Sequence, residues 1–193
     1  MNQGAILRAN ALGIFYLEER MIRLIIGGTR SGKSRHALTM ASDDTGKAKA
    51  YVATAQALDD EMMERIERHK EERSEDWVTF EEPFGLPSLL REICSHFDQV
   101  LVDCLTVWLS NKLLNEPALV DGAVDDLVAA LEETRRKTNY FIVTNEVGMG
   151  IVPESALGRK FRDLAGLLNQ KVAAIADEVW LVAAGIPIKI KGE

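Results

Sequence analysis

The chain has 193 residues, of which 47% are hydrophobic and 27% charged, proportions typical of an ordinary globular protein of one domain. Its 23 basic and 30 acidic side chains give a formal net charge of −7, which argues against nucleic-acid binding because nucleic-acid-binding proteins usually carry a basic excess. Two cysteines, Cys94 and Cys104, are too few for a disulfide scaffold or a metal cluster, and they suit a reducing cytoplasm.

Residues 1–20 precede the core pattern, and we expect them to form an N-terminal extension that is a loose arm, a short helix or disordered. Their apolar run Ile14 to Leu17 is too short for a signal peptide, and no run in the chain reaches the roughly 18 apolar residues of a membrane span. Met21 as the true start is an alternative that the sequence leaves open. Residues 21–193 are expected to form a single domain.

The first specific motif lies where the apolar strand Ile22 to Gly27 meets helix-forming sequence. The next residues complete GGTRSGKS, which matches the pattern G-x-x-x-x-G-K-[ST] of a phosphate-binding loop. Its glycines allow backbone angles that point successive N–H groups at phosphate oxygens, and the following helix adds free amides and the positive end of its dipole. Lys33 then reaches the β and γ phosphates, and the Ser34 hydroxyl can ligate Mg²⁺. The predicted nucleotide-binding loop is Gly27, Gly28, Thr29, Arg30, Ser31, Gly32, Lys33 and Ser34.

Strand-like and helix-like segments alternate along the rest of the chain. Such alternation predicts an α/β fold with a mostly parallel sheet, right-handed crossovers and helices on both faces. The expected strands are Ile22–Gly27, Ala50–Thr54, Trp77–Phe80, Gln99–Asp103, Tyr140–Thr144, Glu178–Ala183 and Ile186–Ile190, the last two joined by a turn. The expected helices are Ser34–Ser42, Leu58–Arg73, one within Pro83–His96, Leu105–Leu114, Val120–Lys137 and Arg159–Ala176.

Polar residues follow several of these strands, at the sheet edge where open α/β sheets bind ligands. Thr54, Ala55 and Gln56 stand at the end of the second strand. Asp103 ends a buried strand, the strand-plus-acid pattern that organises Mg²⁺ in P-loop enzymes, although a solvent-facing acid at a strand end is the alternative. Asn145–Gly150 is a polar, glycine-containing stretch in the equivalent position of a later strand.

The helix predicted at Leu58–Arg73 carries a histidine, His69, whose neighbours are the cations Arg65, Arg68, Lys70 and Arg73. Nearby cations disfavour protonation, so the His69 pKa is expected to be low and the neutral ring is then a nucleophile near pH 7. The alternative is a partly buried helix histidine, because its helix face also carries apolar side chains. His36 and His96 are expected to be structural or solvated.

Several motifs together resemble one enzyme family. They are GGTRSGKSRHA, ATAQ, DDEMMERIERHKEER with Trp77, TNEVGMGIVPE, FRDLAGLLNQ and ADEVWLV. In this order they are similar to the bifunctional adenosylcobinamide kinase / adenosylcobinamide-phosphate guanylyltransferase, over about residues 21–191. The resemblance implies a RecA-like P-loop NTPase fold and a function in cobalamin (vitamin B12) biosynthesis.

The resemblance also implies a two-step reaction. Adenosylcobinamide is phosphorylated with ATP or GTP, and GMP is then transferred from GTP through a GMP-histidine intermediate, giving adenosylcobinamide-GDP and pyrophosphate. It implies that His69 and Lys33 are catalytic and that Ser34 and Asp103 hold Mg²⁺. Further nucleotide contacts carry over to Thr54, Ala55, Gln56, Lys70, Glu71, Glu72, Arg73, Glu81 and Asp103. It also implies a homotrimer, and the net charge of −7 already argued against a nucleic-acid partner.

Two other functions remain open from the residues themselves. One is a P-loop kinase of another small metabolite, with His69 structural. The other is a nucleotide-dependent switch protein, which the sequence disfavours because it lacks a guanine-reading N-K-x-D motif.

Overall fold

The computed structural model describes residues 6–9, 15–42, 47–56, 63, 74 and 76–192. Most of the predicted helix Leu58–Arg73, including His69, lies outside the described residues. No helix in the described part of the chain is long and apolar enough to cross a membrane.

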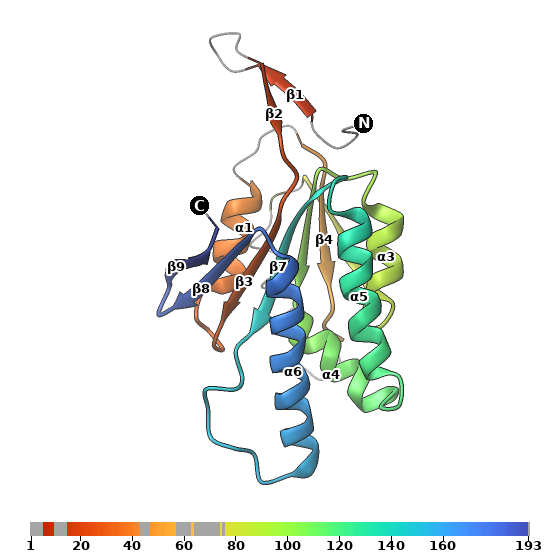
Figure 1. The fold of residues 1–193 in the computed structure, drawn as a ribbon, viewed down its shortest axis with the longest axis vertical. Helices are drawn as coiled ribbons and strands as arrows, with labels where there is room; N and C mark the ends of the chain where they lie inside the picture. Colours follow the sequence, from red (N-terminus) through yellow and green to blue (C-terminus); the bar gives the residue numbers. More distant parts are fainter. Residues whose placement is uncertain are drawn as a thin grey trace.

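Seven strands form the main sheet, in the order β5-β4-β6-β7-β3-β8-β9 (Figure 1). Their bounds are β3 (Ile22–Gly27), β4 (Lys49–Ala53), β5 (Trp77–Glu81), β6 (Gln99–Asp103), β7 (Asn139–Asn145), β8 (Glu178–Ala183) and β9 (Ile186–Lys191). Strands β3 to β8 run parallel, and β9 pairs antiparallel with β8 at one edge. The predicted strands and the mostly parallel sheet are confirmed, with strand ends displaced by no more than one residue.

Five described helices connect or flank these strands. They are α1 (Lys33–Ser42), α3 (Leu86–Ile93), α4 (Leu105–Asn115), α5 (Val120–Thr134) and α6 (Ala156–Ile175). Helix α6 begins three residues earlier than the predicted Arg159, because the Ser155 hydroxyl accepts a hydrogen bond from the backbone N–H of Gly158 and caps the helix.

The helices lie on both faces of the sheet, as predicted. On β6, Val100 and Val102 join the core beneath α3, α4, α5 and α6, whereas Leu101 joins the core beneath α1. Strand β7 alternates in the same way, with Ile142 on the first face and Val143 on the second. Central strands covered on both faces need apolar residues at consecutive positions, which is what the sequence of these strands supplies.

The N-terminal residues form a separate pair of strands. β1 (Ile6–Ala9) and β2 (Phe15–Glu18) pair antiparallel and project from the body of the molecule (Figure 1). Residues 6–9 and 15–18 are therefore extended and not helical, which corrects the short-helix alternative for these two segments, and isoleucine and aromatic residues favour extended backbone. The division into an extension of residues 1–20 and a single domain of residues 21–193 stays a prediction.

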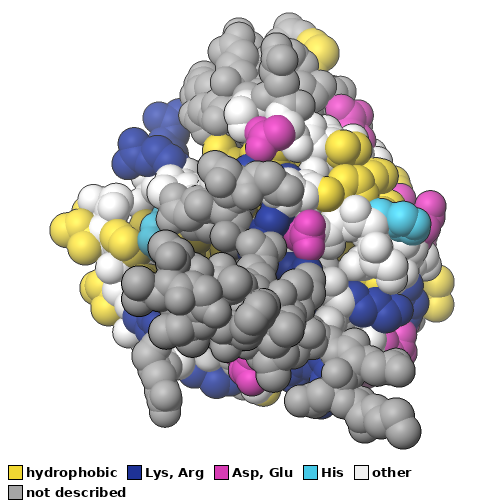
Figure 2. Space-filling model, turned by 90° about the horizontal axis from the view of Figure 1, so that it is seen from above, with side chains coloured by type: hydrophobic (Ala, Val, Ile, Leu, Met, Phe, Trp, Pro, Cys, Tyr) yellow, Lys and Arg dark blue, Asp and Glu magenta, His cyan; other side chains and the backbone are white. Residues whose placement is uncertain are grey.

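The end of the sheet that carries this hairpin is held by ion pairs. Arg20 contacts Asp98 at 2.5 Å, and Lys49 contacts Asp76 at 2.7 Å. Figure 2 looks onto this end, and its visible part shows basic and acidic side chains interspersed, with no uniformly basic face. The carboxyl ends of the parallel strands, where ligands bind in such sheets, lie at the opposite end.

Candidate functional site

The predicted phosphate loop has the strand–loop–helix context that its motif requires. Strand β3 ends at Gly27 and helix α1 begins at Lys33. The first turn of α1 is closed by a hydrogen bond from the backbone N–H of His36 to the carbonyl oxygen of Gly32, at 2.9 Å. The amides that precede His36 therefore have no acceptor within the helix and are available to an anion at its N-terminus.

Two glycines of the loop are required for different reasons. A Cβ on Gly27 would lie 2.4 Å from the carbonyl oxygen of Val182 and 2.6 Å from Oγ of Ser31, so any side chain there would displace the neighbouring strand or the loop. Gly32 has φ +93°, a conformation that side chains rarely adopt. Arg30 also has a positive φ, +58°, which helps the backbone to turn around the loop.

Lys33 lies against the loop rather than extending into solvent. Its side chain is buried, and its Nζ donates a hydrogen bond to the carbonyl oxygen of Gly28 at 3.2 Å. The β8–β9 turn supports the loop from the other side, because the backbone N–H of Gly185 donates to the carbonyl oxygen of Ser31 at 2.8 Å. Sequence reasoning missed this second contact, which joins residues far apart in the chain.

The strand order sets the distances of the other predicted residues from the loop. At about 4.8 Å per strand, Asp103 on β6 ends about 10 Å from β3, whereas Glu81 on β5 ends about 19 Å from it. Thr54 lies between these two, at the end of β4. The structure therefore brings Asp103 close to the phosphate loop, and it leaves Glu81 exposed at the far edge of the sheet.

Asp103 lies on the face of the sheet that α1 covers. Strand alternation places it with Leu101 on that face, and α1 packs across β3, β6 and β7. The Tyr51 hydroxyl donates a hydrogen bond to Oδ2 of Asp103 at 3.0 Å, which fixes the carboxylate and occupies one of its two oxygens. The first turn of α1, with Lys33, and the Asp103 carboxylate thus share one face.

The thiol of Cys104, the residue that follows Asp103, is buried and has a raised pKa. Burial raises the pKa of its thiol most, and the Asp103 charge raises it further, whereas hydrogen bonds from Thr106 and Val107 and the Lys33 charge lower it. The net effect is upward, so the thiol is neutral at pH 7 and is a poor nucleophile. The charges of both Asp103 and Lys33 bear on this one buried thiol, the Lys33 charge least of all the causes.

At the end of β4, the side chain of Thr54 makes structural contacts, although the sequence predicted a nucleotide contact there. Thr54 is fully buried, and its side chain bonds to the backbone of Cys104. The amide of Asn111 donates to the carbonyl oxygens of Thr54 and Pro83, at 2.9 and 3.2 Å. A nucleotide contact at this position therefore falls to the partly buried Ala55 and Gln56 rather than to the Thr54 side chain, and it stays a prediction.

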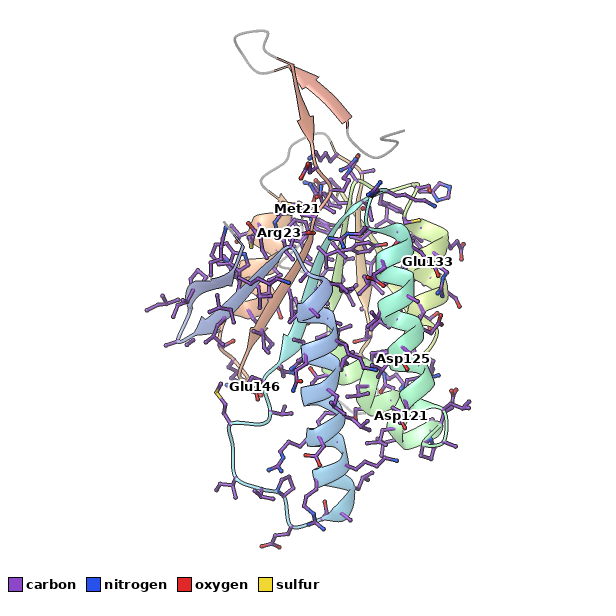
Figure 3. All side chains as sticks on the ribbon, in the orientation of Figure 1. Met21, Arg23, Asp121, Asp125, Glu133 and Glu146 are labelled. Atoms are coloured by element: carbon purple, nitrogen blue, oxygen red, sulfur yellow. The ribbon has the colours of Figure 1, made fainter. Side chains whose placement is uncertain are left out.

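The sequence placed the polar stretch Asn145–Gly150 at a strand end but assigned it no contact, and the structure puts it at the end of β7, between β6 with Asp103 and β3 with the phosphate loop. Asn145 pairs in register with Gly27, and the backbone N–H of Glu146 donates to the Gly27 carbonyl oxygen at 3.1 Å. Figure 3 shows Glu146 at the end of the sheet opposite to Met21 and Arg23. The polar stretch after this strand was visible in the sequence, but only the strand order shows that it adjoins the loop.

The described histidines have structural surroundings, as expected. His36 packs against Trp180 with ring centroids 5.3 Å apart, and burial lowers the pKa of its imidazole. His96 is exposed, with Nδ1 3.2 Å from the carbonyl oxygen of Glu92. The remaining predicted site residues, His69, Lys70, Glu71, Glu72 and Arg73, lie outside the described residues.

The donor set near the loop fits Mg²⁺. Among the described residues there is no group of three or more His, Cys, Asp or Glu side chains arranged to hold a metal ion. Mg²⁺ bound with a nucleotide usually takes only one or two protein oxygens, completed by phosphates and water. The Ser34 hydroxyl in the first turn of α1 and the Asp103 carboxylate on the same face match that requirement.

Comparison with known proteins gives consistent matches along the chain. A family model described as cobinamide kinase / cobinamide phosphate guanyltransferase matches residues 23–190. The bifunctional adenosylcobalamin biosynthesis protein CobU of Salmonella typhimurium is 45% identical over 185 residues, covering 89% of this chain and 100% of that protein. The protein of the same name from Escherichia coli is 43% identical with the same coverage. The bifunctional adenosylcobalamin biosynthesis protein CobP of Pseudomonas aeruginosa is 43% identical over 171 residues, covering 88% of this chain and 97% of that protein.

Among solved structures, the flagellar accessory protein FlaH of Methanocaldococcus jannaschii superposes with a TM-score of 0.55 at 15% identity. The superposition covers 91% of this chain and 80% of that one. At this level of identity the likeness concerns the fold alone.

Proposed function

The chain belongs to the cobinamide kinase / cobinamide phosphate guanyltransferase family, and from this membership we infer that it is a bifunctional, nucleotide-using enzyme of cobalamin biosynthesis. Its first reaction phosphorylates adenosylcobinamide, and its second transfers GMP from GTP to that phosphate. The structural observation that best supports this function is the phosphate loop, with Lys33 buried at the start of α1 and Asp103 on the same face of the sheet.

In the kinase step, the hydroxyl oxygen of the acceptor bonds to the γ-phosphorus of ATP or GTP. The bond from that phosphorus to the β–γ bridging oxygen breaks, the nucleoside diphosphate leaves, and the hydroxyl proton passes to a carboxylate or to water. The protein contributes mainly positioning and charge neutralisation in such reactions. Lys33 and the free amides of the loop supply the positive groups, and Asp103 ends nearer to the loop than Glu81 does.

In the guanylyl step, we propose His69 as the nucleophile. Its neutral imidazole nitrogen bonds to the α-phosphorus of GTP and pyrophosphate leaves. A phosphate oxygen of adenosylcobinamide phosphate then bonds to the same phosphorus, and the bond to the imidazole breaks, giving adenosylcobinamide-GDP. Two displacements with good leaving groups replace one difficult transfer. The basic residues that flank His69 in the sequence support this role, because nearby cations disfavour protonation of an imidazole and attract phosphates.

Mg²⁺ completes the proposed nucleotide site. When bound with the triphosphate, it neutralises charge on the phosphate oxygens. Ser34 is proposed to hold it directly. Asp103 ends two strands away from β3, so its carboxylate is proposed to act through a metal-bound water rather than by direct contact.

We further propose that the enzyme acts in the cytoplasm, where nucleoside triphosphates are available, and that it assembles as a homotrimer. Exposed apolar side chains after β7 are consistent with a contact surface, since Met149 is 85% and Ile151 is 97% exposed in the single chain. Molar mass by light scattering during size-exclusion chromatography measures the assembly directly, and a monomer at working concentration would contradict the trimer.

One labelling experiment tests the function. The protein is incubated with GTP carrying ³²P at the α-phosphate, denatured and separated from free nucleotide. A phosphoramidate to histidine gives label on the protein that is labile in acid and stable in base. GTP labelled at the γ-phosphate is the control and should leave no label on the protein.

The same experiment separates the alternatives. A kinase of another small metabolite or a nucleotide-dependent switch gives no stable label from either GTP. If the α-label is absent while adenosylcobinamide is still phosphorylated, the guanylyl mechanism is wrong and the kinase assignment stands.

A further inference from the structure

We propose that Asn145 is an additional residue of the phosphoryl-transfer site, whose side-chain oxygen Oδ1 accepts a hydrogen bond from an O–H group beside the γ-phosphate. That O–H group belongs either to a water on the metal ion or to the hydroxyl of the phosphate acceptor. The inference rests on the proposed kinase activity and gives a role to Asn145, which lies in the polar stretch Asn145–Gly150 but was assigned no contact from the sequence.

The position of Asn145 is the first argument. It ends β7, the strand that lies between β3 and β6, and it pairs in register with Gly27 of the phosphate loop. Phe141 and Val143, which precede it by four and two residues, pack in the core beneath α1, so strand alternation places Asn145 on that same face. Asp103 occupies this face one strand further along, so Asn145 stands between the loop and the predicted metal carboxylate.

Contacts with Cys104 agree with this location. Nδ2 of Asn145 lies 3.9 Å from the Cys104 sulfur. That sulfur is the atom on which the charges of Lys33 and Asp103 both act. Asn145 therefore contacts the residue that directly follows Asp103 at the end of β6.

The side chain of Asn145 is held in one orientation by buried neighbours. The Thr106 Oγ1 accepts from the backbone N–H of Asn145 at 3.0 Å and from Nδ2 at 2.9 Å. On the other face of the strand, Nδ2 of Asn169 donates to the carbonyl oxygen of Asn145 at 3.1 Å, and Oδ1 of Asn169 accepts from the Thr144 hydroxyl at 2.8 Å. Thr106 and Asn169 are themselves buried. Thr106 thus holds the side-chain amide and Asn169 holds the backbone of the same residue, as a residue that positions a reacting group requires.

The remaining atom of the amide, Oδ1, is buried and has no hydrogen-bond partner among the described residues. Leaving a buried acceptor unpaired is unfavourable, so such an atom usually has a function or a further partner. Phosphate oxygens of a bound nucleotide carry no proton at neutral pH and cannot donate to it. The donors expected beside the γ-phosphate are a metal-bound water and the acceptor hydroxyl, which is why the inference names an O–H group.

Two substitutions and a control test the inference. Asn145→Ala removes the acceptor, and Asn145→Asp keeps an oxygen acceptor in nearly the same place. Asn115→Ala removes the same amide from an exposed position on α4. We expect kcat of the kinase step to fall by about 100-fold in Asn145→Ala, by analogy with loss of one oriented hydrogen bond at a reacting centre, and to be unchanged in Asn115→Ala. Asn145→Asp should retain a higher kcat than Asn145→Ala.

The two sources of the O–H group are separated by a binding measurement that needs no turnover. Binding of the β,γ-imido analogue of ATP is measured by calorimetry at increasing Mg²⁺ concentration. If the donor is a metal-bound water, Asn145→Ala should need more Mg²⁺ for the same affinity. If the donor is the acceptor hydroxyl, the Mg²⁺ dependence should match the wild type and only kcat should fall.

Three results would overturn the inference. The first is a kcat and a Mg²⁺ dependence that are both unchanged in Asn145→Ala. The second is a kcat of Asn145→Asp at or below that of Asn145→Ala, which would mean that the amide donates to phosphate instead of accepting. The third is a fall in kcat in Asn115→Ala as large as the fall in Asn145→Ala. A wild-type protein without kinase activity would instead contradict the proposed function, so the two failures are distinguishable.

Discussion

The hydroxyl of Thr54 forms two hydrogen bonds with the backbone of Cys104. It donates to the Cys104 carbonyl oxygen at 2.8 Å and accepts from the Cys104 N–H at 2.9 Å. Thr54 follows β4, and Cys104 follows Asp103 at the end of β6. One threonine side chain thus joins two neighbouring strand ends directly beside the predicted metal carboxylate.

Removing this hydroxyl should destabilise the fold. Thr54→Val preserves the shape but leaves the buried N–H of Cys104 without its acceptor, whereas the Cys104 carbonyl oxygen keeps its bond from the Trp108 N–H. We therefore expect the free energy of unfolding to fall by about 1–3 kcal/mol. Thr54→Ser keeps the hydroxyl and is the matched control. Urea denaturation followed by circular dichroism measures the difference, and a valine variant as stable as the serine variant would show that the two bonds contribute little.

Asp103 should control the response to Mg²⁺. Asp103→Asn retains the size of the side chain and loses its charge, so binding of a triphosphate should require more Mg²⁺ while metal-free nucleotide binding changes little. Asp121→Asn, on the exposed face of α5, is the control (Figure 3). Nucleotide affinity measured at increasing Mg²⁺ concentration checks this requirement. Identical titration curves for wild type and Asp103→Asn would reduce Asp103 to a structural residue.

Lys33 should be needed for both reactions, because both use a triphosphate. Lys33→Ala removes the charge next to the phosphates, and we expect kcat/KM of each half-reaction to fall by roughly 100- to 1,000-fold. Lys160→Ala, at an exposed position of α6, should leave both rates unchanged. Initial rates with separately supplied acceptors give the measurement. Near-normal phosphorylation by Lys33→Ala is the result that contradicts the assigned loop.

His69 should separate the two activities. His69→Ala removes the proposed nucleophile and leaves Lys33, Ser34 and Asp103 in place, so phosphorylation should continue while guanylyl transfer drops to background and labelling by α-³²P-GTP disappears. His96→Ala, at an exposed position, is the control and should keep both activities. Guanylyl transfer that survives in His69→Ala, or equal loss of both activities in the folded variant, would reject the proposed mechanism.

His36 should make the fold less stable in mild acid. Burial lowers its pKa below the ordinary value of 6.5, so at pH values below 6.5 the unfolded chain binds a proton more readily than the folded one. The unfolding free energy should therefore fall as the pH drops from 6.5 through the folded pKa. His36→Phe keeps an aromatic ring against Trp180 and should flatten this part of the profile. Urea denaturation at pH 5 to 8 measures the unfolding free energy, and His96→Gln is the control. If His36→Phe showed the same pH dependence of the unfolding free energy as the wild type, His36 would not be its cause.

Much of the fold was encoded locally and could be read from the sequence. The strand Ile22–Gly27, the loop after it and the start of α1 are consecutive in the chain, and short-range spacing of apolar, glycine and charged residues determines them. Asp103 was found for the same reason, because it follows its own buried strand directly. The short-helix alternative was wrong for residues 6–9 and 15–18, since short apolar runs do not distinguish a strand from a helix.

The relations between strands could not be read in this way. The sequence showed a polar stretch after β7, but only the order β6-β7-β3 places Asn145 beside Gly27 and within reach of Cys104. The same order leaves Glu81 at the far edge of the sheet. Parallel strands are joined by long crossovers, so strands that are adjacent in the sheet can be far apart in the sequence.

The sequence by itself identified the groups of the proposed chemistry: a phosphate loop with Lys33, an acid at Asp103, and a histidine flanked by cations at His69. Tertiary structure decided which groups share a site. Thr106 holds Asn145 across 39 residues of chain, and Thr54 bonds to Cys104 across 50. These residues meet because folding brings the carboxyl ends of the parallel strands together at one edge of the sheet. The spacing of residues in the sequence does not show which strand ends will be adjacent.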